Sequence, residues 1–212
     1  MELKSLPKSL HDITLEQWVN WNIQYGKDLA VKAKAEKTAD ETMLYWDEFY
    51  SKYYSFYANT PLEDVLAVLV DSPDLYTGII KEAALTQAVL YREMQALKNL
   101  DLVNTEFDYL GFKWKIQSPV NVVNPKELTV EEFEQSQHTA LIFADLQDGV
   151  TSAIYELCSA YIVSTEGDKL TSDIIKPLPL YIALCVKRYV EETINLYTAL
   201  ANDREHNTTQ PV

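Results

Sequence analysis

Turn-forming residues are scarce in this chain. Its 212 residues include only 5 glycines and 8 prolines, whereas folds made of many short strands need turn residues at frequent intervals. The scarcity therefore argues against a turn-rich sandwich or barrel. The length suffices for one substantial domain, and 47% hydrophobic with 24% charged residues is ordinary for a globular protein.

Positive charge is also in deficit. The chain has 18 Lys and Arg against 32 Asp and Glu, which gives a formal net charge of -14. Nucleic-acid binding depends on cations that displace phosphate counterions, and anionic membranes attract basic segments. We therefore expect neither nucleic acid nor a membrane as the main partner.

Long apolar runs are missing. The longest, VLAVLV at 65–70 and IYELCSAYIV at 154–163, are shorter than the roughly 20 residues that a bilayer requires. The opening MELKSLPKSL has no apolar signal-peptide core. Cys158 and Cys185 lie within apolar helical patterns and are interpreted as buried, reduced thiols. We expect synthesis in the cytoplasm of the cell, without secretion or insertion into a membrane.

The motifs of common catalytic and cofactor sites are absent. The sequence contains no HExxH, CxxC, P-loop, GxSxG or GxGxxG. His11, His138 and His206 have no second metal ligand at a suitable spacing. Asp145 and Asp148 are interpreted as part of a helix end, because two carboxylates without a pocket are a weak catalytic signal. We expect no catalytic residue, cofactor or metal, and interpret the protein as non-enzymatic.

One phrase occurs twice, as LHDITLEQW at 10–18 and LTVEEF at 128–133. Thr14 and Thr129 each stand three residues before a Gln or Glu, which is the spacing of a helix capping box. In both copies an apolar residue precedes the cap and another follows the box, as in a hydrophobic staple. TPLE at 60–63 is a third predicted start, with Pro at the first helical position. The phrase is therefore interpreted as a helix start rather than a binding motif.

Hydrophobic periodicity predicts a mainly α-helical, bundle-like domain. The predicted helices cover about 15–37 (weakened at Gly26), 40–58, a short stretch that follows Pro61 and stops near 71–73, 74–99, the segments from 130 onward with breaks near Asp148–Gly149 and Gly167, and 179–202. We predict a single domain at 1–202 and a flexible tail at 203–212.

A change of period predicts one β-hairpin inserted among the helices, as a sub-lobe at 104–118. In GFKWKIQ, Phe112, Trp114 and Ile116 alternate with polar residues, which is typical of a half-buried strand. TEFDYL precedes it and is expected to pair with it across Leu110–Gly111.

The segment YWDEFYSKYYSFY at 45–57 is unusually aromatic. Its aromatic residues are Tyr45, Trp46, Phe49, Tyr50, Tyr53, Tyr54, Phe56 and Tyr57. Five of them share one helical stripe, but Tyr45, Tyr54 and Phe56 do not. Three interpretations stay open: core packing alone, core packing plus a protein interface, and ligand stacking. Under the interface interpretation, exposed tyrosines such as Tyr54 contact a partner, and Tyr54→Ser spares stability but breaks assembly.

The segment PKSLHDITLEQW resembles the N-terminus of small proteins encoded among the virion genes of tailed bacteriophages. The matching residues are Pro7, Ser9, Leu10, Asp12, Ile13, Thr14, Leu15, Gln17, Trp18 and those at 127–133. The resemblance implies a non-enzymatic structural or assembly role, as a neck or tail component of the virion or as a tail-assembly chaperone. It implies phage structural proteins as partners and the host cytoplasm or the virion as location. Self-association is compatible with this role.

A second hypothesis comes from the charge. A small acidic regulatory or inhibitory protein could bind a basic site on a host factor, since the net charge of -14 would steer such an encounter.

Overall fold

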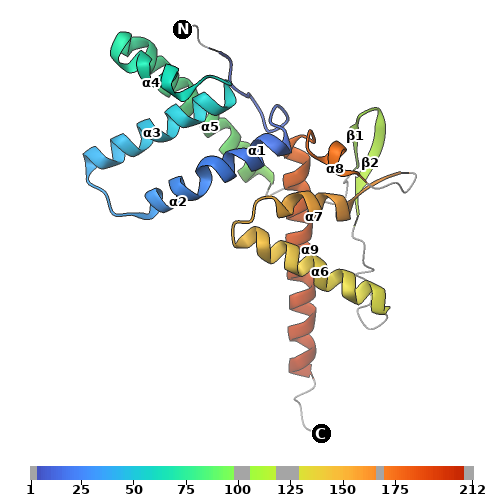
Figure 1. Ribbon diagram of the computed structural model, residues 1–212. Helices are drawn as coiled ribbons and strands as arrows, with labels where there is room; N and C mark the ends of the chain where they lie inside the picture. Colours follow the sequence, from blue (N-terminus) through green and yellow to red (C-terminus); the bar gives the residue numbers. More distant parts are fainter. Residues whose placement is uncertain (1–3, 98–105, 118–128, 166–169, 208–212) are drawn as a thin grey trace. The chain divides into compact units, whose positions relative to one another are not determined.

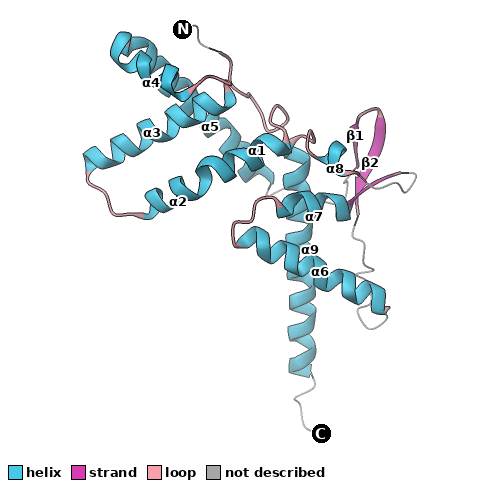
Figure 2. Ribbon diagram, in the orientation of Figure 1, coloured by secondary structure: helices cyan, strands magenta, loops and turns pink. Residues whose placement is uncertain are grey.

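The computed structural model describes residues 4–97, 106–117, 129–165 and 170–207 (Figure 1). Two compact units are present, Met1–Ala96 and Leu97–Val212, where the sequence analysis predicts one domain at 1–202. Figure 2 shows that helices dominate both units and that, within the described ranges, the strands form one small sheet. The predicted fold class, mainly α-helical with a small β insertion, is confirmed.

The secondary-structure elements of the first unit are all helices in its described part. Its elements are α1 (Leu15–Trp21), the π-helical turn η1 (Asn22–Gly26), α2 (Lys27–Lys34), α3 (Ala39–Tyr57), α4 (Leu62–Asp71) and α5 (Pro73–Leu97). The π-turn ends at Gly26, where the sequence predicts a weak point. A Cβ at Gly26 would lie 3.0 Å from the side-chain oxygen of Asn22, so the absence of a side chain suits this turn.

The helix start predicted at Thr14 is confirmed. Thr14 Oγ1 accepts a hydrogen bond from Gln17 N at 3.2 Å, and Gln17 Oε1 accepts one from Thr14 N at 2.9 Å. A reciprocal box of the same kind joins Thr38 and Glu41 at the start of α3, which the sequence analysis missed. The helix α6 begins at Val130, directly after Thr129.

The short helix predicted after Pro61 is confirmed as α4, but the predicted place of Pro61 at the first helical position is wrong. Pro61 stands at the cap with an extended ψ of 137°, and α4 begins at Leu62 without a side-chain cap. The hydroxyl of Thr60 instead donates to the carbonyl of Ala58 at 3.3 Å. Thr60 therefore belongs to the turn that ends α3.

The core of the first unit includes the segment before α1. Leu6, Leu10 and Ile13 are buried there. The backbone N–H of Leu10 donates to the carboxylate of Glu93 on α5 at 2.7 Å. The opening phrase is thus part of the core and of a helix cap.

The second unit combines four helices and a three-stranded sheet in its described part. These elements are β1 (Glu106–Tyr109), β2 (Phe112–Ile116), α6 (Val130–Gln147), α7 (Ala153–Tyr161), β3 (Ile162–Ser164), α8 (Ser172–Ile175) and α9 (Leu180–Asn207). The strands are antiparallel in the order β1-β2-β3. The helix α7 packs against both α6 and α9.

The predicted hairpin is confirmed, with its turn at Leu110–Gly111. The third strand was not predicted, because IVS continues the apolar helical pattern of α7. The predicted burial of Phe112 is wrong, since its side chain is 63% exposed. Trp114 and Ile116, at alternate positions of the same strand, are buried, so the face that carries these three side chains is covered only toward the C-terminal end of β2.

The helix ends follow the predictions in part. The predicted end near Asp145 and Asp148 is confirmed, because α6 stops at Gln147 and Val150 N donates to Asp145 O at 2.8 Å. The helix α9 extends to Asn207, so residues 203–207 of the predicted tail are helical. This stretch, DREHN, contains no proline or glycine to stop the backbone ladder. The remaining tail residues and Gly167 lie outside the described ranges.

Within the described ranges, every helix is too short or too polar to cross a bilayer.

Candidate protein-binding surface

The C-terminal half of the aromatic segment is core. The indole of Trp21 contacts four rings of α3, with centroid distances of 6.0 Å to Phe49, 5.5 Å to Tyr53, 5.6 Å to Phe56 and 5.9 Å to Tyr57. Tyr53 is only 5% exposed. Burial raises the pKa of the Tyr53 and Tyr57 hydroxyls above the ordinary tyrosine value. These rings hold α3 against the end of α1.

Tyr54 is also buried, which makes its predicted exposure wrong. Its side chain is fully inaccessible, and its hydroxyl accepts a hydrogen bond from Lys4 N at 2.8 Å. The prediction assumed that one face of α3 is covered. In the structure, Trp21 contacts one side of the helix and the segment before α1 contacts another.

The N-terminal half of the same stripe is open. Met43 is 68% exposed and Trp46 is 44% exposed, while Tyr50 is half-buried. The rings of Trp46 and Tyr50 are stacked at 5.6 Å with an interplanar angle of 21°. Met43, Trp46 and Tyr50 are spaced by three and four residues, so they lie on one face of the helix. We call these three residues the open stripe.

Ion pairs join α3 to α2. Glu48 accepts hydrogen bonds from Lys32 at 2.8 Å and from Lys52 at 2.6 Å, and Lys32 also pairs with Asp28 at 3.2 Å. The hydrogen bonds from Lys32 and Lys52 hold the pKa of Glu48 below its ordinary value. The hydrogen bond to Glu48 in turn raises the pKa of Lys32. The network fixes the spacing of the two helices.

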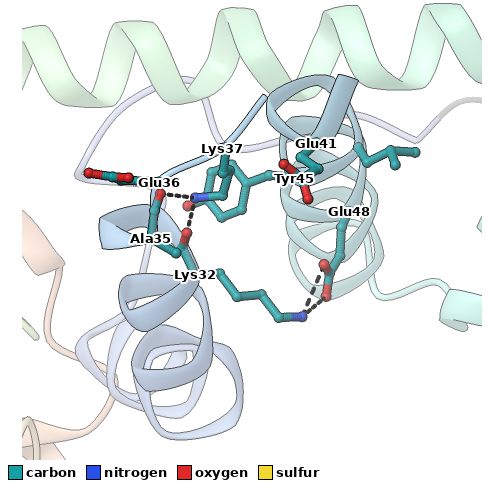
Figure 3. A pocket seen from close by; sticks show the side chains of 8 residues that line it. Lys32, Ala35, Glu36, Lys37, Glu41, Tyr45 and Glu48 are labelled. Carbon is teal, nitrogen blue, oxygen red and sulfur yellow. Dashed lines mark hydrogen bonds and ion pairs between the residues drawn. The ribbon is translucent and has the colours of Figure 1, made fainter. Parts of the chain in front are cut away.

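A hollow of about 310 Å³ lies between α2 and α3 (Figure 3). Lys37 lies over the ring of Tyr45 at 4.8 Å from its centroid, and it donates to the backbone carbonyls of Lys32 and Ala35. Glu41 lines the hollow, and its carboxylate accepts a hydrogen bond from Thr38 N in the capping box of α3. Because these charged groups are bonded within the protein, we assign them a structural role in the connection between the helices.

The two charged residues one turn from Met43 are both acidic. Between Thr38 and Ile80 the sequence has a single cation, Lys52, and it is bonded to Glu48. Asp40 is exposed and Asp47 is half-buried, and both lie within one turn of Met43. The open stripe is therefore apolar and aromatic with an acidic border.

Comparisons of the chain with models of protein families, with curated proteins and with solved structures found no match. No family is assigned.

The remaining candidate residues do not converge on one site. His138 is exposed on α6, and the side chain of His206 lies outside the described residues. Within the described ranges, no group of three or more His, Cys, Asp or Glu could hold a metal ion. Both cysteines are free thiols. Cys158 is buried, as predicted, whereas Cys185 is partly exposed.

Sequence reasoning missed Met43 as part of the surface, although its spacing from Trp46 and Tyr50 was available. Met43 is not aromatic and precedes the aromatic segment at 45–57, so the aromatic pattern does not include it. A further group of exposed apolar residues lies on α4 and α5, namely Leu66, Leu69, Val70, Leu85 and Val89. The helical periodicity does not predict their exposure, because it shows which residues share a face of a helix and not which face is covered.

Proposed function

We propose that this protein is a non-enzymatic bacteriophage structural or assembly protein that acts through protein-protein contacts. Its role is that of a neck or tail component or of a tail-assembly chaperone. The observation that carries the proposal is the open stripe, where Met43 and Trp46 are 68% and 44% exposed. Trp, Tyr and Met are enriched in protein interfaces, and burial of a large side chain stabilises by about 1.5–3 kcal/mol.

The resemblance to phage virion-region proteins supports the same role. Within the resembling segment, Leu10 and Ile13 are 1% and 2% exposed, and Thr14 caps α1. Residues of this kind maintain a fold and do not contact partners. The resemblance therefore supports a shared N-terminal architecture, and α3 supplies the contact surface.

Quantitative mass spectrometry of purified phage particles and of lysates from infected cells tests the proposal. A virion component is expected in a fixed number of copies per particle. A chaperone is expected only in lysates, in complexes with tail proteins. If the protein occurs neither in particles nor with any phage structural protein, the proposal is overturned.

The alternative is an acidic regulatory or inhibitory protein that binds a basic site on a host factor. The observation that favours it is the near absence of cations between Thr38 and Ile80. It predicts a complex with one host protein that weakens as salt increases, because screening reduces charge attraction. Capture from uninfected cells separates the two functions, since only the inhibitor has a host target there.

A further inference from the structure

We propose that the open stripe docks a basic segment of a partner protein that also carries large apolar side chains. Its apolar side chains cover Met43, Trp46 and Tyr50, and its Lys or Arg side chains reach Asp40 and Asp47. The inference rests on the proposed function, which assigns the protein contacts of this chain to α3, and it specifies the chemistry of the partner.

The first argument is that the open stripe is the uncovered continuation of a packed one. Tyr53 and Tyr57 extend the stripe toward the C-terminus of α3, and both contact Trp21. One turn before Tyr53, the face becomes accessible at Tyr50 and Trp46. The covered half anchors the helix, and the stacking of Trp46 on Tyr50 at 5.6 Å orients the exposed ring. A surface ordered in advance loses less conformational entropy on binding.

The second argument is charge. Asp40 precedes Met43 by three residues and Asp47 follows it by four, so both carboxylates neighbour Met43 at the edge of the open stripe. The cations that contact Glu48 of α3, Lys32 and Lys52, are both bonded to it, at 2.8 and 2.6 Å. The border of the stripe therefore favours a cationic partner, and the net charge of -14 accelerates its approach.

Charge also decides against other occupants. A second copy of the chain would place the same carboxylates opposite one another in a symmetric contact, and facing like charges oppose association. Nucleic acid and anionic lipid would be repelled by the same carboxylates. The exposed Leu85 and Val89 on α5 are flanked by both Lys81 and Glu82, so their surroundings select no particular partner.

The experiment uses the full chain as bait against random short peptides displayed on yeast. Peptides that combine Lys or Arg with Leu, Phe or Trp are expected to be enriched. One selected peptide is then synthesised, and its Kd is measured by fluorescence anisotropy. Trp46→Ser is expected to weaken binding at least tenfold, which equals 1.4 kcal/mol. Leu66→Ser, a change at an exposed apolar position of α4, is the matched control and should leave the Kd unchanged.

A charge-matched pair of variants separates docking from general attraction. Asp40→Asn with Asp47→Asn should weaken peptide binding more than Asp64→Asn with Asp71→Asn, although both pairs remove two charges. Thermal melting checks that each variant folds. Should Trp46→Ser unfold the protein, Met43→Ser at the 68% exposed position replaces it.

Several outcomes would overturn the proposal. These are the absence of enriched peptides, enrichment of neutral or acidic peptides, and equal binding by the wild type and the open-stripe variants. An equal loss in both aspartate pairs would also overturn it. So would self-association in sedimentation that Trp46→Ser abolishes, because the stripe would then join two copies. Particle mass spectrometry is independent of all these results: a protein present in particles that selects no basic peptide retains the proposed function and loses only this inference.

Discussion

The hydroxyl oxygen of Tyr54 accepts a hydrogen bond from the backbone N–H of Lys4, 2.8 Å away and fifty positions earlier in the chain. The Lys4 side chain also donates to Asn59 O at 3.0 Å. The segment before α1 thus lies against the C-terminal end of α3. This contact makes Tyr54 part of the core and leaves the open stripe as the accessible aromatic surface of α3.

Tyr54→Ser is expected to destabilise the protein by about 3–5 kcal/mol, the usual cost of removing a buried ring. Trp46→Ser should cost less than half as much, because its ring is 44% exposed. Urea denaturation measures both free energies of unfolding. Equal losses would mean that Trp46 is covered in solution and that the open stripe is core.

The neighbouring tyrosines should respond in opposite directions to loss of the hydroxyl alone. Tyr54→Phe removes a made hydrogen bond and should cost about 1 kcal/mol. The Tyr53 hydroxyl is buried and has no hydrogen-bond partner among the described residues, so Tyr53→Phe should be neutral or stabilising. Thermal melts of the two variants, which share the same chemical change, provide the comparison. A loss in Tyr53→Phe equal to that in Tyr54→Phe would contradict it.

The two capping boxes should contribute similar stability. Thr14→Ala and Thr38→Ala are each expected to cost about 1 kcal/mol, the typical loss at an N-cap. Thr171 is the control, because it precedes α8 without a side-chain capping bond, and Thr171→Ala should have little effect. If Thr129 caps α6 as Thr14 caps α1, Thr129→Ala is expected to cost as much stability as Thr14→Ala. Unchanged melting of Thr14→Ala would return the opening phrase to consideration as a binding motif.

Acidification should remove the stabilisation provided by Glu48. Its pKa in the folded state is lowered from an ordinary value of 4.5, so its ion pairs are fully effective above that value. They are lost as pH falls through the lower folded-state pKa. Glu48→Gln should therefore destabilise at neutral pH, by no more than about 1 kcal/mol for such a solvent-screened network, and have no effect in strong acid. Exposed Glu82 provides the control, and a Glu48→Gln loss that is constant with pH would contradict the prediction.

The sequence Leu110–Gly111 is not the one preferred for this type of hairpin turn. Leu110 has a φ of +54° and Gly111 a φ of +81°, a left-handed pair for which Asn-Gly is the preferred sequence. Leu110→Asn is expected to stabilise the second unit by up to about 1 kcal/mol, since the left-handed conformation costs other residues about 1–2 kcal/mol. Hydrogen exchange at Phe107 and Trp114 should slow in this variant. Gly111→Ala should have the opposite effect, and faster exchange in Leu110→Asn would exclude this turn geometry.

Local features of the sequence determined much of the secondary structure. The box at Thr14 and Gln17 and the hairpin turn at Leu110 and Gly111 each depend on residues close together in the chain. Their interactions are complete within a few residues, so the sequence pattern alone predicts them. The box at Thr38 and Glu41 has the same pattern and was available to the same reasoning.

The tertiary structure decided which side chains are covered. Tyr54 is buried because a segment fifty positions away lies on it, whereas Phe112, which shares the alternation of Trp114 and Ile116, is 63% exposed. The open stripe exists because Trp21 reaches Phe49, Tyr53, Phe56 and Tyr57, while Met43 and Trp46 remain accessible. Helical periodicity places these rings on shared faces of α3, but burial depends on partners distant in the sequence. Only the folded chain brings those partners together.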